Sequence, residues 1–393
     1  MRLPRILIAG SALSLCAVAR AVYAPIPDQE QGKALTVSIE GGISYNSNIF
    51  GAATDPISSM VYELSPKLTF NTPGGSNDTF YTGEIHPTLD YFDNRPGTKE
   101  VYGIAADGRI AHSFSAASVL MVSDAYSYDQ NPEAILNGAP LNTDQTIQSN
   151  EFNARYSFSP TEKLGLVVKA RSLYFDYINT ILGDELNRFE NLYGLEADFA
   201  LLPEFKLAGE YRHEDVDYRS GPSGKNKHSD FLMAGFDYSV GPQLSASVRV
   251  GGEFRHRAGL SDETTPYIEV SGKYDYAKGS FVSVGYTYSL EETSDPTRFS
   301  DERVNKVFVN LQHAFTALIV GSASLDYEPS TLHGLPGTPD VSEDTTRAGL
   351  ALTYLPNRNW SVTASYDYDF VDSGLSDRGL NRSRLGVSAT VEY

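Results

Sequence analysis

Apolar residues recur at every second position along most of this chain, and this alternation restricts its fold more than any other feature. In residues 382–393, one face of an extended strand carries Leu385, Val387, Ala389, Val391 and Tyr393. The positions between them are small or polar, among them Arg384, Ser388 and Glu392. Successive side chains of a strand point to opposite faces, so this segment has one apolar and one polar face. Such a strand needs a neighbour along each edge and an apolar medium on one side.

The same pattern recurs from residue 34 onward. Leu35, Val37 and Ile39 begin the first such segment, and Met60 and Tyr62 begin the second. Short turns, such as 160–162 and 278–280, alternate with longer and often acidic stretches, such as 328–344. This rhythm is typical of an all-β, transmembrane antiparallel up-and-down β-barrel, with short periplasmic turns and long extracellular loops. Counting the turns and loops predicts about 18 strands, within a range of roughly 16 to 18.

The composition separates this barrel from other fold classes. With 25 Tyr, 19 Phe and 33 Gly but only four Met and one Trp, the chain suits strands and turns better than helices. Beyond the first 25 residues, no apolar run approaches the roughly 18 residues expected of a membrane helix. The alternative is a soluble, secreted all-β protein such as a large sandwich or a solenoid. No fixed sequence repeat of about 20 to 50 residues is visible, which counts against the solenoid.

The N-terminal segment predicts export. Arg2 and Arg5 precede an apolar stretch at 6–18 and then small residues. Residues 1–24 are therefore interpreted as a secretory signal peptide, cleaved after Ala21 or Ala24. Residues 25–33 form a short periplasmic lead, and residues 34–393 form the barrel. The single cysteine, Cys16, lies within the signal, so the mature chain is expected to have neither a disulfide nor a cysteine metal site.

Charge and histidine placement argue against several functions. Without the three arginines of the signal, 28 basic residues stand against 50 acidic ones, so nucleic acid is not an expected partner. The seven histidines show no metal-ligand spacing, and no Gly-x-Ser-x-Gly motif is found. His213, Glu214 and Asp215 form one local polar cluster, but lone groups at strand ends are usually solvated. We therefore expect no enzyme activity, no cofactor and no metal site.

If one strand face meets lipid, the other lines the lumen. The pore-lining candidates are the charged residues at these alternate positions, Glu84, Asp90, Arg109, Lys169, Arg171, Arg212, Arg249, Arg255, Arg347, Asp367 and Arg384. Arginines facing carboxylates would order water and favour polar solutes over apolar ones. The plainer alternative is that these charges pair across strands and only satisfy a wet interior.

The fifth strand, near residues 119–128, fits two orientations. Either Val119 and Met121 or Leu120 and Val122 face lipid. A carboxylate is expected to avoid the lipid face, so Asp124 favours the first orientation.

Two local patterns resemble known proteins. The segment Leu385 to Tyr393 resembles the terminal insertion signal of bacterial outer-membrane β-barrels, which implies recognition by the barrel-assembly machinery. The stretch Gly42-Ile43-Ser44-Tyr45-Asn46-Ser47-Asn48-Ile49-Phe50 resembles the opening of the putative β-barrel porin type 2 family. These resemblances imply a location in the bacterial outer membrane, with outer-membrane lipids and lipopolysaccharide around the barrel.

The resemblance to porins implies passive diffusion of small polar solutes. Because the third loop of porins commonly folds inward, Asp129–Ser149 is the candidate constriction, although a mobile external loop fits this segment equally well. The family also resembles outer-membrane proteins of exopolysaccharide secretion, so the alternative function is the barrel of an exopolysaccharide export system that passes oligosaccharides. A structural or adhesive barrel, closed by its own side chains, is the third hypothesis. The sequence leaves a homo-oligomer open.

Overall fold

The computed structural model describes residues 34–72, 78–130, 146–220, 225–257 and 259–393. These residues form eighteen strands and one short helix, α1 (Thr180–Leu186), between β7 and β8. The strands are β1 (Leu35–Asn46), β2 (Ser59–Asn71), β3 (Thr79–Phe92), β4 (Glu100–Ser115), β5 (Ser118–Asp129), β6 (Ile147–Phe158), β7 (Leu164–Tyr177), β8 (Arg188–Leu202), β9 (Phe205–Tyr218), β10 (Lys227–Val240), β11 (Leu244–Arg257), β12 (Glu263–Ala277), β13 (Ser280–Glu291), β14 (Phe299–Ala314), β15 (Ile319–Gly334), β16 (Val341–Asn357), β17 (Trp360–Ser373) and β18 (Leu380–Glu392). No helix in these ranges is long and apolar enough to cross a membrane.

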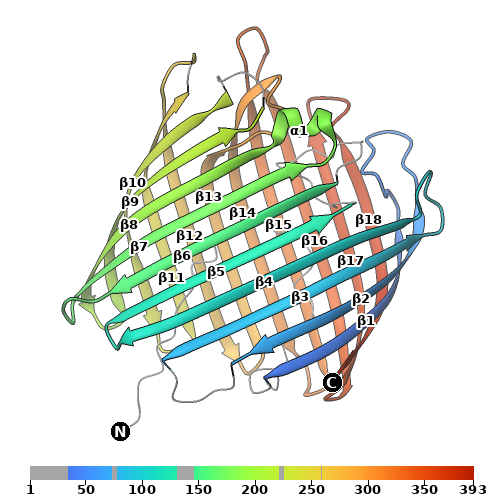
Figure 1. Ribbon diagram of the computed structural model, residues 1–393, viewed down its shortest axis with the longest axis horizontal. Coiled ribbons are helices and arrows are strands. Elements are labelled where there is room, and N and C mark those ends of the chain that lie inside the picture. Colours follow the sequence, from blue (N-terminus) through green and yellow to red (C-terminus); the bar gives the residue numbers. More distant parts are fainter. Residues whose placement is uncertain (1–33, 73–77, 131–145, 221–224, 258) are drawn as a thin grey trace.

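The sheet closes on itself (Figure 1). Each strand pairs antiparallel with its neighbours in sequence, and β1 also pairs with β18, placing Ile43 opposite Val387. At the end of this seam, the Val37 and Tyr393 backbones exchange N–H···O bonds of 3.2 and 2.8 Å. The predicted 18-stranded antiparallel barrel is therefore confirmed.

The two faces of each strand have the chemistry that the alternation predicts. On β1, Leu35, Val37 and Ile39 are exposed, whereas Thr36 and Ser38 are buried. Large apolar residues are exposed along the outer face of most other strands as well. An apolar exterior around a polar interior is the arrangement of a membrane barrel, so the inward residues are those that a solute would meet.

The two ends of the barrel differ in their connections. Helix α1 lies at one end and the C-terminus at the other (Figure 1). At the C-terminal end, tight turns join strands, and Gly279 supplies a positive φ of 69° between β12 and β13. Polar strand ends still pair through their backbones, so the acidic stretch 328–344 contains only residues 335–340 outside β15 and β16.

The expected orientation of β5 is wrong. Val122 pairs with Ile110, which is 52 % exposed on the outer face, so Leu120 and Val122 face lipid in place of Val119 and Met121. Asp124 therefore lies on the outer face, where Asn150 Nδ2 donates a hydrogen bond to it at 3.1 Å. The hydrogen bond from Asn150 partly offsets the free-energy cost of placing the Asp124 carboxylate on the outer face. This contact comes from the neighbouring strand β6, so the sequence pattern of β5 alone could not reveal it.

The sheet bends sharply between β10 and β11. A Cβ atom on Gly235 would lie 1.7 Å from the carbonyl oxygen of Val248, and one on Gly251 would lie 1.9 Å from that of Leu232. Both glycines sit at inward positions, so a side chain there would meet the backbone of the neighbouring strand. We call this bend the glycine crease. It brings luminal side chains from strands that are not adjacent within reach of one another.

Candidate functional site in the barrel lumen

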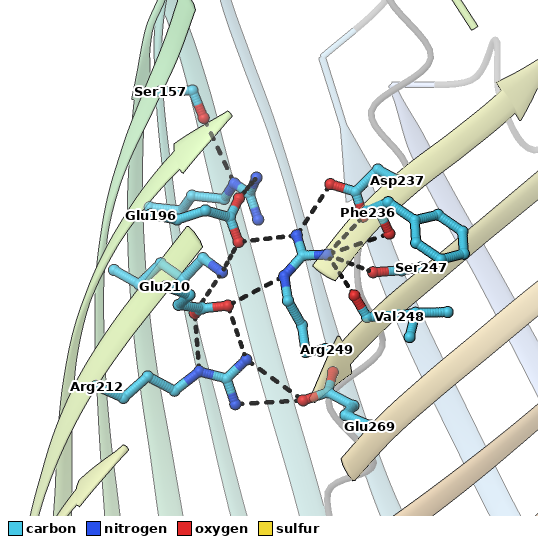
Figure 2. A network of polar contacts seen from close by, with 12 residues as sticks. Ser157, Glu196, Glu210, Arg212, Phe236, Asp237, Ser247, Val248, Arg249 and Glu269 are labelled. Carbon is cyan, nitrogen blue, oxygen red and sulfur yellow. Dashed lines mark hydrogen bonds and ion pairs between the residues drawn. The ribbon is translucent and has the colours of Figure 1, made fainter. Parts of the chain in front are cut away.

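A network of ion pairs lies on the luminal wall beside the glycine crease, and Figure 2 shows it from close by. Arg249 on β11 binds Glu196 on β8 at 3.1 Å, Glu210 on β9 at 3.4 Å and Asp237 on β10 at 2.9 Å. Lys169 on β7 joins the same two glutamates at 2.9 and 2.8 Å. An arginine can reach across three strands in this way only where the wall curves tightly.

Arg212 extends the network toward the opposite wall. Its guanidinium contacts Glu210 at 2.8 Å and Glu269 on β12 at 3.2 Å. The phenol of Tyr267 donates to Glu269 at 3.0 Å. Arg155 lies 4.0 Å from Glu196, which completes a set of four cationic and four carboxylate side chains. Each of these charges has a partner of opposite sign, so the network braces the wall.

The remaining pore-lining candidates also lie on inward strand faces, in smaller groups. Arg171 meets Glu214 at 3.4 Å, and Arg255 meets Glu253 at 2.8 Å. Glu84 lies 3.4 Å from Lys67, on the same wall as Asp90 and Arg109. On the far wall, Arg384 lies 3.2 Å from Asp369 and opposite Asp367 in register, and Arg347 lies opposite Asp369. The structure thus brings three of the eleven, Lys169, Arg212 and Arg249, together around Glu196 and Glu210. That these residues line a conducting pore stays a prediction.

A chamber of about 540 Å³ opens above the network, in the half of the lumen nearer the outer loops. Residues of β3 to β10 line one side of the chamber and residues of β12 to β14 line the other. Phe175, Phe231, Tyr267 and Phe308 give it aromatic surface. Its charged lining comprises eight carboxyl and five cationic side chains, so carboxyl groups outnumber cations around the chamber.

The loop formed by residues 292–298, which we call loop 7, folds inward at the top of this chamber. Glu292, Thr293 and Ser294 are each less than 7 % exposed. Glu292 forms an ion pair with Lys227 on β10 and accepts a 2.6 Å hydrogen bond from the phenol of Tyr218 on β9. On its other side, Ser294 accepts a 3.2 Å hydrogen bond from Arg378, which Glu343 holds through two oxygens at 2.9 and 3.1 Å. Loop 7 therefore joins opposite parts of the rim across the lumen.

The electrostatics of Glu292 favour this docked position. Burial alone would raise the pKa of the Glu292 carboxyl, but the charges of Lys227, Arg255 and Arg257 lower it to about 2. The carboxylate is therefore ionised at neutral pH and holds loop 7 against the β10 and β11 wall.

The expected constriction, Asp129–Ser149, has its central residues 131–145 outside the described part of the chain. Asp129 and Ile147–Ser149 belong to β5 and β6. Among the described outer loops, loop 7 is the one with both flanks tied across the lumen. Sequence reasoning placed Glu292 in a loop and gave no signal for its inward position, because its partners lie 65 or more residues away.

The terminal segment occupies its predicted face. Leu385, Val387 and Tyr393 are exposed on the outside of β18, and Ala389 and Val391 share that face in register with β1. Its role as an insertion signal stays a prediction.

Comparison with known proteins gives a family and a fold. Residues 34–393 match the family described as putative beta-barrel porin 2. No curated protein matches the chain in sequence.

Several solved outer-membrane proteins of Pseudomonas aeruginosa are similar in structure. OccK2 (OpdF) has 10 % identity and a TM-score of 0.47, with coverage of 91 % of this chain and 98 % of that one. OccK5 (OpdH) has 11 % identity and a TM-score of 0.46, with coverage of 92 % and 99 %. The siderophore receptor PirA has 9 % identity and a TM-score of 0.41, with coverage of 92 % and 80 %. Likenesses at this level say nothing about function.

Proposed function

The chain belongs to the putative beta-barrel porin 2 family, a family of outer-membrane β-barrels, and from that premise we propose that it conducts small polar solutes by passive diffusion. The observation that carries the proposal is the aqueous chamber in a lumen lined by charged side chains. An apolar solute would displace water from the charged side chains and leave them without hydrogen bonds. A polar solute can form hydrogen bonds to the same side chains in place of the water.

The charge of the chamber supports a preference for cations. The charges of the network at the glycine crease are paired with one another, so they add less to selectivity than the chamber does. Above it, carboxylates such as Asp129 and Glu190 outnumber the cationic lining residues. An excess of fixed negative charge in a narrow, partly enclosed space raises the local concentration of cations.

Loop 7 serves as the constriction in this proposal. The segment Asp129–Ser149, predicted as either a constriction or an external loop, stays a second candidate. The docking of loop 7 through Glu292 and Ser294 leaves polar and charged groups, rather than apolar ones, along the narrowed path.

Single-channel recording in a planar bilayer tests the proposal. Refolded protein should give stable, ohmic openings at low voltage. Under a potassium chloride gradient, the reversal potential should have the sign of a cation-preferring pore, and neutral monosaccharides should permeate. A folded barrel that never conducts would exclude diffusion and leave the structural barrel, whereas selective block by an anionic oligosaccharide would favour exopolysaccharide export.

We also propose that the chain is exported through the signal at residues 1–24. The barrel-assembly machinery would then recognise β18. Lipopolysaccharide would surround the exposed apolar belt.

A further inference from the structure

Three side chains with metal-binding atoms meet at the outer end of the barrel. Glu263 begins β12, Asp301 lies near the start of β14 and His333 lies near the end of β15. The imidazole Nδ1 of His333 lies 2.9 Å from Oδ1 of Asp301 and 4.0 Å from Oε1 of Glu263. One nitrogen and two carboxylate oxygens thus lie within 4.8 Å of one another. From this geometry we infer that the rim holds a binding site for a transition-metal dication of the Zn²⁺ type.

The spacing of the donor atoms fits one ion. Bonds of about 2.1 Å in a tetrahedral site separate the ligand atoms by about 3.4 Å. The observed separations lie on both sides of that value, so small side-chain rotations bring all three atoms to a shared centre. A mixed imidazole and carboxylate set favours zinc-like dications over Ca²⁺ or Mg²⁺, which take oxygen ligands. Once the metal displaces the imidazole proton, two carboxylates and a neutral imidazole match the charge of the dication.

The backbone and neighbouring groups position Asp301 for this role. The β14–β15 register shifts between Phe299 and Asp301, and this irregularity sets Asp301 opposite His333. Irregularities of this kind re-aim side chains. The hydroxyl of Ser300 donates to the other carboxylate oxygen, Oδ2, at 2.7 Å. Oδ2 is held while Oδ1 faces His333, the arrangement in which an outer group orients a metal ligand.

The nearby arginines leave the site accessible to an ion. Arg303 lies 3.6 Å from Glu263, but its side chain is 37 % exposed and can turn into solvent. Arg255 approaches Oδ2 of Asp301 at 3.9 Å and has a nearer partner in Glu253. The cluster of Glu196, Asp198 and Asp237 also brings carboxylates within 4.8 Å, but Arg249 and Lys169 already bind it at 2.9 to 3.1 Å. Of these two clusters, only the rim cluster contains a histidine, and only its neighbouring arginines can be displaced by an ion.

The test is a metal titration of the folded, tag-free barrel in detergent. We expect one Co²⁺ per chain with visible absorption bands of low coordination number, displaced by Zn²⁺ and not by Ca²⁺. His333→Ala should lower the Zn²⁺ affinity by well over tenfold, and Ser300→Ala by about tenfold, as loss of an outer-shell partner does. His313→Ala is the matched control, because that imidazole stacks on Tyr276 near the opposite end of β14 and should leave affinity unchanged.

A second control addresses the histidines on the outer face. The rings of His228 and His256 lie 4.9 Å apart on β10 and β11 and offer a competing site. Loss of binding in a His228→Ala/His256→Ala variant, with retention in His333→Ala, would overturn the inference. So would a folded wild-type barrel that takes up no metal. Gel mobility of unheated samples monitors folding, and Asp301→Asn, which keeps the shape of the side chain, gives a second variant of the site.

Discussion

Glu292→Gln should release loop 7 from the barrel wall. The variant keeps the size of the side chain and removes its charge, so Lys227 loses its carboxylate partner in a place where both side chains are at most 5 % exposed. A pKa of about 2, against an ordinary value of 4.5, corresponds to about 3 kcal/mol in favour of the docked, ionised carboxylate. Breaking a buried ion pair from one side typically costs about 3–5 kcal/mol, which agrees with this figure.

A loss of about 3 kcal/mol shifts the ratio of undocked to docked loop by about a hundredfold. In single-channel recordings, Glu292→Gln should therefore occupy a second, larger conductance level that the wild type visits rarely. Glu162→Gln is the matched control, since Glu162 is exposed in the short turn between β6 and β7, away from the lumen and from loop 7. That control should conduct as the wild type does.

A double-mutant cycle makes the test strict. If Glu292 and Lys227 hold loop 7 together, the effects of Lys227→Gln and Glu292→Gln on the occupancy of the larger conductance level should not be additive. Either substitution alone already breaks the ion pair. Additive effects of the two substitutions, or a Glu292→Gln channel with the wild-type conductance, would refute the reasoning.

Three further outcomes are expected. The docked position lowers the pKa of Glu292 to about 2, so the contribution of this carboxylate to loop docking is complete above the ordinary pKa of 4.5 and is lost as pH falls through about 2. The larger conductance level should therefore appear as the pH is lowered from 4.5 to about 2. A constant conductance over this range would contradict the role given to Glu292. Leu350→Arg, on the lipid face of β16, should destabilise the barrel in vesicles by about 2–4 kcal/mol in urea unfolding, whereas the inward Ser365→Arg should cost much less; equal losses would mean that the faces are misassigned. Gly235→Ala should cost about 1–3 kcal/mol by driving a methyl group into the Val248 carbonyl, whereas Gly41→Ala, with nothing within 4 Å of its Cβ, should be close to neutral in the same assay.

The sequence predicts the barrel well because its signal is local. Alternation depends on neighbouring residues only, so Leu35, Val37 and Ile39 reveal their common face without any partner strand. The same reasoning failed for β5, where register with Ile110 decides the face and outweighs the cost of an outward Asp124. The stretch 328–344 forms a shorter loop than its polar sequence indicates for a related reason, since backbone pairing continues into polar segments.

The sites depend on contacts that no local pattern contains. Alternation correctly gave inward faces to Lys169, Arg212 and Arg249, but it could not show that a bend gathers them around Glu196 and Glu210. The rim cluster joins residues 263, 301 and 333, which is why histidine spacing in the sequence predicted no metal site. Loop 7 was missed because the partners of Glu292 come from distant strands.

Because of the glycine crease, the number of strands alone does not determine the width of the lumen. Eighteen strands set the perimeter of the barrel, and for a given perimeter a circle encloses the largest area. A bend at Gly235 and Gly251 is therefore expected to reduce the cross-section without removing a strand. Two barrels with equal strand counts can then differ in the width of the lumen, and in this one the bend depends on two residues that have no side chain.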